Sequence, residues 1–188
     1  LRTMGWSDYK RWADTHNLEE WWESRTKQLA RMIPAGTSVI EFGAGRRRLQ
    51  AFLDPSCAYI ASDLVERGPG TFLCDLNCRP LPDLQHLAPQ VAVFAGVLEY
   101  VRDVPAVVEW LAAHVRCCVA SYAVAHPSGF AGRLARGVKR TYYGYMNAYG
   151  EADLVALFGR GGFACRQIDS WNDQRLFLFT RTPAEARS

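Results

Sequence analysis

The sequence predicts an α/β fold in which a mostly parallel sheet carries helices on both faces. Short apolar runs alternate with segments of helical periodicity, which is the pattern of parallel strands joined by crossover helices. The first predicted strand ends directly in a glycine-rich turn, Gly43-Ala44-Gly45. Near the end of the chain, two strand-like segments flank Asn172-Asp173, a pair that suits a hairpin turn. The length of 188 residues leaves room for one domain with short additions.

The N-terminal part of the chain is expected to be helical. Residues 7–33 read as a helix in two pieces, and Thr15 or Asn17 can cap the second piece. The residues that recur there at helical spacing are Leu18, Trp21, Trp22, Arg25, Leu29 and Met32. We therefore expect residues 1–35 to form a helical cap and residues 36–188 to form a single compact domain.

The remaining elements follow in a regular order. Strands are expected at 38–42, 58–62, 71–74, 91–95, 115–122, 163–171 and 174–181. One helix should follow the glycine turn, with Leu49, Phe52 and Leu53 facing inward. A second should begin after Asp103, which can cap it, and a third should cover residues 151–158. Residues 123–149 form a long connection rich in Gly, Arg and Tyr, and such connections are often functional.

Composition excludes several classes of protein. Hydrophobic residues make up 49% and charged residues 22% of the chain, which is ordinary for a globular protein and excludes disorder, collagen and coiled coil. The net charge of +3 is too small to argue for nucleic acid. No apolar run approaches the roughly 18–20 residues that span a bilayer, and the N-terminus lacks a signal-peptide core. We expect a cytoplasmic protein with no membrane contact.

The six cysteines are expected to be reduced and mostly buried. Cys74 and Cys78 have a spacing that a metal could use, but no second Cys/His pair of matching spacing lies nearby. Cys117 and Cys118 sit inside an apolar run, where free cysteine behaves as a small hydrophobe. We therefore predict no metal site.

Acidic residues and glycines follow the predicted strands, where ligands bind to open α/β sheets. Gly43 and Gly45 permit positive φ and a close approach of backbone to a ligand. Asp63 lies 20 residues after Gly43, at the end of the next strand, where a carboxylate can accept both hydroxyls of a ribose. Asp75, after the third strand, can accept from an exocyclic amine such as that of adenine.

Two features distinguish this pattern from a dinucleotide site. The dinucleotide fingerprint has a third glycine, so that a helix N-terminus meets a pyrophosphate, but Arg48 stands at that position. The strand also ends in Glu41, whose carboxylate suits a cationic amino group and opposes a phosphate. An amino-acid-bearing nucleoside fits these residues better.

With these residues, the chain over roughly 36–182 resembles the class I S-adenosylmethionine-dependent methyltransferases. Residues 41–45 look like the family's acid-x-Gly-x-Gly motif, and residues 96–101 are similar to its fourth-strand motif. This chain departs from the family's motifs at Arg48, where the family commonly has glycine, and at Tyr100, where the family commonly has histidine. The resemblance implies a Rossmann-like sheet of order 3-2-1-4-5-7-6 with strand 7 antiparallel, and S-adenosylmethionine as cofactor, with S-adenosylhomocysteine as product. The cofactor-binding residues that it implies are Glu41, Gly43, Ala44, Gly45, Asp63, Leu64, Asp75, Leu76, Gly96, Val97 and Tyr100.

The predicted activity is methyl transfer to a small molecule or biosynthetic intermediate. The candidates for a catalytic base are His126, Glu99 and Tyr149, and none stands out. The candidates for substrate contacts are Tyr9, Trp12, Arg133, Tyr142 and Tyr145. Residues 46–48 are three arginines. Either they form a solvated face, or one of them binds an anionic group, which would be the methionine carboxylate or an anionic acceptor. The fourth-strand motif lacks the Asn/Asp-Pro-Pro-aromatic sequence of nucleic-acid base methyltransferases, which argues against a nucleic-acid acceptor. The alternatives are an NAD-linked oxidoreductase and a non-catalytic binding module.

Overall fold

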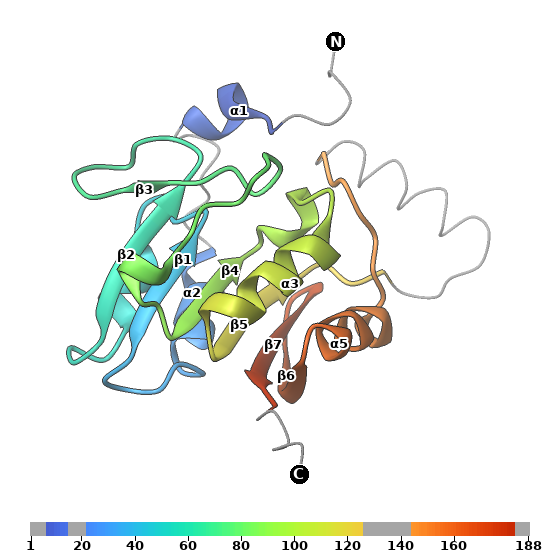
Figure 1. Cartoon of the computed structure of the whole chain (residues 1–188). Helices are drawn as coiled ribbons and strands as arrows, with labels where there is room; N and C mark the ends of the chain where they lie inside the picture. The colour runs from blue at the N-terminus through green and yellow to red at the C-terminus, as the bar shows by residue number, and fades with distance from the viewer. Residues whose placement is uncertain (1–6, 15–21, 126–143, 183–188) are drawn as a thin grey trace.

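One seven-stranded sheet organises the molecule, with the order β3-β2-β1-β4-β5-β7-β6. The structure, a computed structural model, describes residues 7–14, 22–125 and 144–182. The strands are β1 (Ser38–Phe42), β2 (Ala58–Asp63), β3 (Phe72–Leu73), β4 (Val91–Ala95), β5 (Cys117–Tyr122), β6 (Phe163–Trp171) and β7 (Gln174–Arg181). The pairs among β1 to β5 are parallel, whereas β7 runs antiparallel to both β5 and β6. The predicted strand order and the antiparallel strand 7 are confirmed (Figure 1).

The helices agree with the sequence prediction less well than the strands do. The α-helices are α1 (Tyr9–Ala13), α2 (Glu23–Ala30), α3 (Val104–His114) and α5 (Glu151–Arg160). Three short 3₁₀ helices are η3 (Arg48–Phe52), η4 (Gln85–Leu87) and η5 (Leu98–Tyr100). As predicted, Asp103 caps α3, and its carboxylate accepts from the backbone N–H of Ala106 at 3.1 Å. The proposed caps Thr15 and Asn17 lie outside the described residues, and α2 begins only at Glu23.

The helix expected after the glycine turn is the five-residue 3₁₀ helix η3. Its N-cap residue, Arg47, has φ 55° and therefore lies in the left-handed region. A residue in that conformation interrupts right-handed helical backbone, so an α-helix cannot run continuously from Gly45. Leu49 is still fully buried, as its predicted inward position requires.

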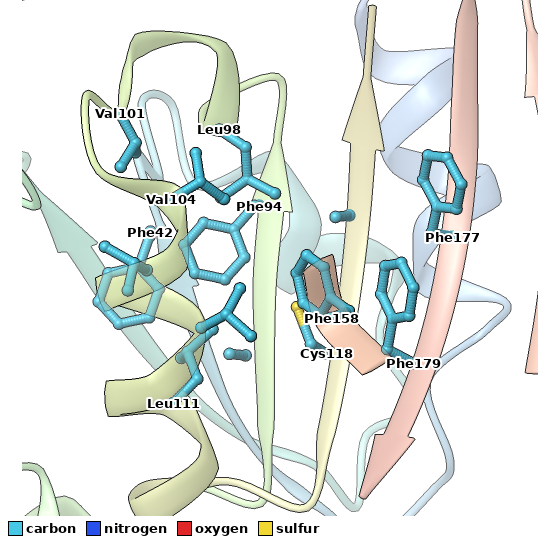
Figure 2. Packing of buried hydrophobic residues seen from close by; sticks show 14 of the residues in the cluster. Phe42, Phe94, Leu98, Val101, Val104, Leu111, Cys118, Phe158, Phe177 and Phe179 are labelled. Atoms are coloured by element: carbon cyan, nitrogen blue, oxygen red, sulfur yellow. The ribbon is translucent and has the colours of Figure 1, made fainter. Parts of the chain in front are cut away.

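Two layers of helices cover the sheet. On one face, α3 and α5 pack over a core that includes Phe42, Phe94, Phe158 and Phe179 (Figure 2). On the other face, α2 and η3 pack over a second core, to which Leu29 and Val93 belong. Figure 1 shows α3 in front of the sheet and α2 behind it. Since side chains alternate along a strand, residues 39 and 41 of β1 face α2, and residues 40 and 42 face α3. Within the described residues, no helix has the length and hydropathy that a bilayer span requires.

The aromatic stack between α5 and β7 should be a main source of stability. The rings of Phe158 and Phe179 are parallel, with centroids 3.9 Å apart, and both side chains are fully buried. Phe158→Ala should therefore lower the free energy of unfolding by about 3–5 kcal/mol, measured by urea denaturation. Ile168→Ala on β6 is the control, because Ile168 is 43% exposed and its loss should cost at most about 1 kcal/mol. Equal losses in the two variants would contradict a core centred on the stack.

Candidate functional site

The parallel register brings the predicted site residues to one edge of the sheet. Phe42 at the end of β1 pairs with Ser62 of β2 and with Phe94 of β4. The residues that follow these strands therefore lie side by side: the glycine turn after β1, Asp63 at the end of β2, and Gly96 after β4. In Figure 1 this edge lies uppermost, and α1 crosses above it.

The glycine turn after β1 is shaped by its neighbours on β2 and β4. Gly43 has φ 67° and Gly45 has φ 50°, both in the left-handed region. A Cβ on Gly43 would lie 2.6 Å from Cγ2 of Val97, so no side chain fits there. The N–H of Ala44 donates to the carbonyl of Ser62 at 2.9 Å, which fixes the turn against β2. The turn thus presents backbone, with no side chain at Gly43, to the edge of the sheet.

Asp63 is the centre of a buried polar junction. Its carboxylate accepts from the N–H groups of Gly45 at 2.9 Å and Leu64 at 2.7 Å. The guanidinium of Arg67 completes the junction, with Nε 3.1 Å from Oδ2, and both side chains are about 95% buried. Arg67 also donates to the carbonyl of Trp12 in α1. The residue predicted to bind ribose is therefore already tied to the glycine turn and, through Arg67, to the N-terminal helix.

Glu41 is a buried carboxylate on the α2 face of the sheet. It is 3% exposed and accepts a hydrogen bond from the Tyr59 hydroxyl at 2.5 Å. Burial raises the pKa of Glu41 to about 8, although the Tyr59 hydroxyl and the positive charge of Arg25 both oppose the rise. The site therefore contains an acid whose charge state changes near neutral pH, and a cationic ligand group would favour its ionised form.

Asp75, the predicted adenine-side acid, binds the N-terminal segment. Its two oxygens accept from the hydroxyls of Ser7 at 2.6 Å and Tyr9 at 2.8 Å. Partial burial acts to raise the pKa of Asp75, but hydrogen bonds from Ser7, from the N–H of Asn77 and from Tyr9 outweigh it and lower the pKa. Asp75 therefore remains a carboxylate, and α1 is attached to the site through it.

Aromatic side chains line the same edge between α1 and the end of β4. The rings of Trp12 and Tyr100 meet edge to face at 4.9 Å, and those of Tyr100 and Tyr145 at 5.3 Å. Trp12 of α1 and Tyr145 of the long connection thus both contact Tyr100, and their role in substrate binding stays a prediction. Arg133, Tyr142 and His126 lie outside the described residues.

The described candidates for a catalytic base make contacts within the protein. Glu99 is 1% exposed, and its carboxylate accepts from the N–H of Ala123 at 2.8 Å. Its carbonyl also accepts from the N–H of Met146 at 2.7 Å, so Glu99 joins η5 to the chain after β5. Tyr149 donates its N–H to the Tyr122 hydroxyl at 2.9 Å. These contacts give both residues a role in holding the edge of the site together.

Two of the three arginines after the glycine turn hold other parts of the chain. Arg47 donates to the carbonyl oxygens of Gly68 and Pro69 and to the Thr71 hydroxyl, and so fixes the loop between β2 and β3. Arg48 lies 3.3 Å from Glu23 of α2. Both residues thus have partners within the protein. A contact of an arginine in this run with a ligand stays a prediction.

Sequence reasoning missed two buried arginines at the site, Arg25 and Arg67. Arg25 recurs at helical spacing with the apolar residues of α2, and a cation among these apolar residues is a signal that could have indicated a buried charge. It is 4% exposed and donates to the carbonyl of Ala95 at 3.1 Å. Arg67 carries no comparable signal, because its pairing with Asp63 depends on the path of the loop.

The described residues contain no group of three or more His, Cys, Asp or Glu side chains that could hold a metal. The six cysteines are free, and Cys74, Cys117 and Cys118 are buried. The burial predicted for the Cys117-Cys118 pair is confirmed, and burial raises the pKa of the Cys117 thiol to about 11.

The raised pKa of Glu41 should make stability depend on pH. The folded protein binds a proton at Glu41 that the unfolded chain has released, between the usual pKa of 4.5 and about 8. The free energy of unfolding should therefore fall as pH rises through this window, by up to a few kcal/mol, since a pKa rise of one corresponds to about 1.4 kcal/mol. Glu41→Gln keeps an acceptor for Tyr59 and should show a flatter profile in urea denaturation between pH 5 and 8. Parallel profiles for the variant and the wild type would contradict the raised pKa.

Comparison with known proteins shows what this architecture is similar to. No protein-family model and no curated protein matches the sequence. Among solved structures, a chain assigned as a methyltransferase, in complex with the Haloferax volcanii activator Trm112, has a TM-score of 0.71 at 13% identity. The match covers 96% of this chain and 98% of that one. Burkholderia thailandensis 1,6-didemethyltoxoflavin-N1-methyltransferase, solved with S-adenosylhomocysteine, has a TM-score of 0.65 at 17% identity, with 93% and 84% covered.

The mitomycin 7-O-methyltransferase MmcR has a TM-score of 0.68 at 15% identity, and the match covers 95% of this chain but 62% of MmcR. This chain likewise spans 54% of the pyocyanin biosynthetic protein PhzM. The similarity is one of fold, and the sheet of this chain has the order 3-2-1-4-5-7-6 with an antiparallel strand 7. This chain therefore has the Rossmann-like fold of the class I S-adenosylmethionine-dependent methyltransferases.

Proposed function

We propose that the protein transfers a methyl group from S-adenosylmethionine to a small-molecule acceptor. The observation that carries the proposal is the arrangement of Glu41, the glycine turn and Asp63 on adjacent strand ends. Val97 packs where a Cβ of Gly43 would lie, so the turn carries no side chain there and presents its backbone to the edge of the sheet. When bound, the cofactor supplies a methyl group made electrophilic by its sulfonium.

The chain's own residues fit a nucleoside that carries an amino acid. Glu41 offers a buried carboxylate to the cationic amino group, and Asp63 offers one to the ribose hydroxyls. Asp75 would accept from the adenine amine at the oxygens that now accept from Ser7 and Tyr9. We assign the backbone around Ala44, Leu64, Leu76 and Gly96, together with Val97 and Tyr100, to the walls of the same site.

The names of similar structures support a small-molecule acceptor. One of them is a 1,6-didemethyltoxoflavin methyltransferase that was solved with that compound, another is mitomycin 7-O-methyltransferase, and a third is a methyltransferase of calicheamicin biosynthesis. In this chain, the aromatic side chains of Trp12, Tyr100 and Tyr145 would orient an acceptor beside the end of β4. Methyl transfer by in-line displacement depends mainly on such proximity and orientation.

The geometry argues against the dinucleotide alternative. A pyrophosphate needs the N-terminus of a helix after the glycine turn, but the chain forms only the 3₁₀ turn η3 there, preceded by left-handed Arg47. The ionised form of Glu41 would also repel a phosphate. Calorimetry with S-adenosylmethionine and S-adenosylhomocysteine, run beside NAD and NADP, tests the proposal. Binding of NAD alone would overturn it. A screen for S-adenosylhomocysteine release across acceptor classes then separates an enzyme from a non-catalytic binding module.

Asp63→Ala should weaken the binding of S-adenosylhomocysteine by about 1.5–3 kcal/mol, because hydrogen bonds to a charged group would be lost. Isothermal titration calorimetry below the melting temperature measures the change. Asp103→Ala is the matched control, since it removes the cap of α3 at a cost of about 1 kcal/mol of stability without touching the site. Unchanged affinity in folded Asp63→Ala would show that Asp63 is not the ribose ligand.

We propose further that the N-terminal residues 1–35 act as a cap over this site, with α1 held through Asp75. Tyr9→Phe removes the hydroxyl that donates to Asp75 at 2.8 Å. The amides of residues 9–13 should then exchange with solvent about 5- to 10-fold faster, as the loss of one partly exposed hydrogen bond implies. Hydrogen-exchange mass spectrometry measures the rates, and the peptides of β4 serve as the internal control. Unchanged rates at α1 would mean that Asp75 does not hold the cap.

A further inference from the structure

The guanidinium of Arg25 is a buried cation at the end of β4. It lies between two indole rings, with Cζ 5.4 Å from the centroid of Trp22 and 5.5 Å from that of Trp171. One terminal nitrogen donates to Oε1 of Gln174 at 3.2 Å, and the other donates to the carbonyl of Ala95 at 3.1 Å. The Nε–H is buried and has no hydrogen-bond partner. The group is therefore held firmly but is not fully satisfied.

Within the part of the chain that the structure describes, Arg25 has no partner of opposite charge at contact distance. The ion pairs among the described residues are Arg48–Glu23, Arg67–Asp63, His114–Asp83 and Arg175–Glu151. Burial lowers the pKa of Arg25, and the carboxylates of Glu99 and Glu41 oppose this only from a longer range. A buried charge without a contacting counter-ion is costly, so its retention requires an explanation.

The chain is adapted to let this guanidinium reach the edge of the sheet. Gly96 directly follows β4 and has φ 70°. A Cβ at Gly96 would lie 2.7 Å from Nη1 of Arg25, so a side chain there would displace the guanidinium. Arg25 thus lies against the residue assigned to the cofactor site. It shares the α2 face of the sheet with Glu41, which is close enough to act on it electrostatically.

We propose that Arg25 is the carboxylate receptor of this site, with its Nε–H and a terminal N–H directed to a carboxylate of the bound ligand. This inference rests on the proposed function, because the ligand is either the cofactor or the acceptor. Arginine suits the role, since its planar fork binds carboxylates through two parallel hydrogen bonds.

Two ligands could supply the carboxylate. The amino-acid end of the cofactor carries an ammonium and a carboxylate. Glu41 would bind the ammonium and Arg25 the carboxylate, since the two side chains do not form an ion pair with each other. An acceptor with a carboxylate would reach Arg25 from the side of Tyr100 and Tyr145, which also lie within its electrostatic range. The chemistry is the same in both cases, and binding measurements distinguish them.

The test compares Arg25→Met with wild type by titration calorimetry, using S-adenosylhomocysteine and 5′-methylthioadenosine. The second compound has the nucleoside but no carboxylate. If the cofactor supplies the carboxylate, Arg25→Met should bind S-adenosylhomocysteine roughly 10- to 100-fold more weakly and bind 5′-methylthioadenosine like wild type. Arg31→Met is the matched control, because Arg31 is an exposed arginine at the end of the same helix.

If the acceptor supplies the carboxylate, both nucleosides should bind Arg25→Met normally. Benzoate, but not benzamide, should then bind wild type saturated with S-adenosylhomocysteine, and Arg25→Met should lose that binding. An equal weakening of both nucleosides would overturn the inference, because it would indicate a structural role. The inference would also be overturned if Arg25→Met bound both S-adenosylhomocysteine and benzoate as wild type does.

The outcome is separable from that of the proposed function. Failure of wild type to bind S-adenosylhomocysteine contradicts the proposed function, whereas the inference about Arg25 fails only when wild type binds and the variant does not discriminate. If Arg25→Met does not fold, Arg25→Lys keeps the charge but not the fork. Arg25→Lys should bind the carboxylate-bearing ligand more weakly than wild type does, and it should bind 5′-methylthioadenosine with wild-type affinity. If Arg25→Lys and wild type bind the carboxylate-bearing ligand equally well, the inference is overturned.

Discussion

The buried carboxylate of Asp63 is the interaction on which the arrangement of the site depends. It joins the turn after β1 to the end of β2 through the N–H of Gly45, and it holds Arg67 by an ion pair at 3.1 Å. Arg67 in turn reaches the backbone of Trp12 in α1. Because one side chain organises three segments, the glycine turn keeps the left-handed conformation that its two glycines permit. Any ligand bound at Asp63 would therefore contact a group that already determines the shape of the site.

The α2 face of the sheet combines an apolar core with isolated charges. Leu29, Val39 and Val93 are fully buried there, and the same layer contains Glu41 and Arg25. In the described part of the chain, neither group forms a close ion pair, and desolvation disfavours the charged form of each. Proteins commonly give up stability at sites that must bind a charged ligand. The two groups thus carry a cost in stability, for which the proposed ligand binding would give a reason.

The sheet could be predicted from the sequence because its determinants are local. Strands β6 and β7 have the predicted bounds, since the apolar runs are long and the turn residues Asn172-Asp173 separate them. The start of η3 at Arg48 could not be predicted, because it follows the left-handed backbone of Arg47, a residue type that gives no such indication. The contact of Tyr9 with Asp75 joins residues 66 positions apart, and no periodicity encodes it. At the site, the sequence thus indicated the strand-end residues, whereas their partners required the three-dimensional structure.

The side of the site proposed to receive the acceptor includes segments outside the regular strands. Asn147 donates to the carbonyls of Leu98 and Val101, both at 2.7 Å, and its side-chain oxygen accepts from the Tyr122 hydroxyl. These bonds attach the end of the long connection to the turn after β4, and Tyr145 thereby meets Tyr100. The sheet thus positions the residues proposed to bind the cofactor, and residues 144–149 and α1 lie beside them. If the proposed function holds, changes in these two segments would alter the choice of acceptor and leave the residues on the strand ends in place, since methyl transfer depends on how the acceptor is aligned.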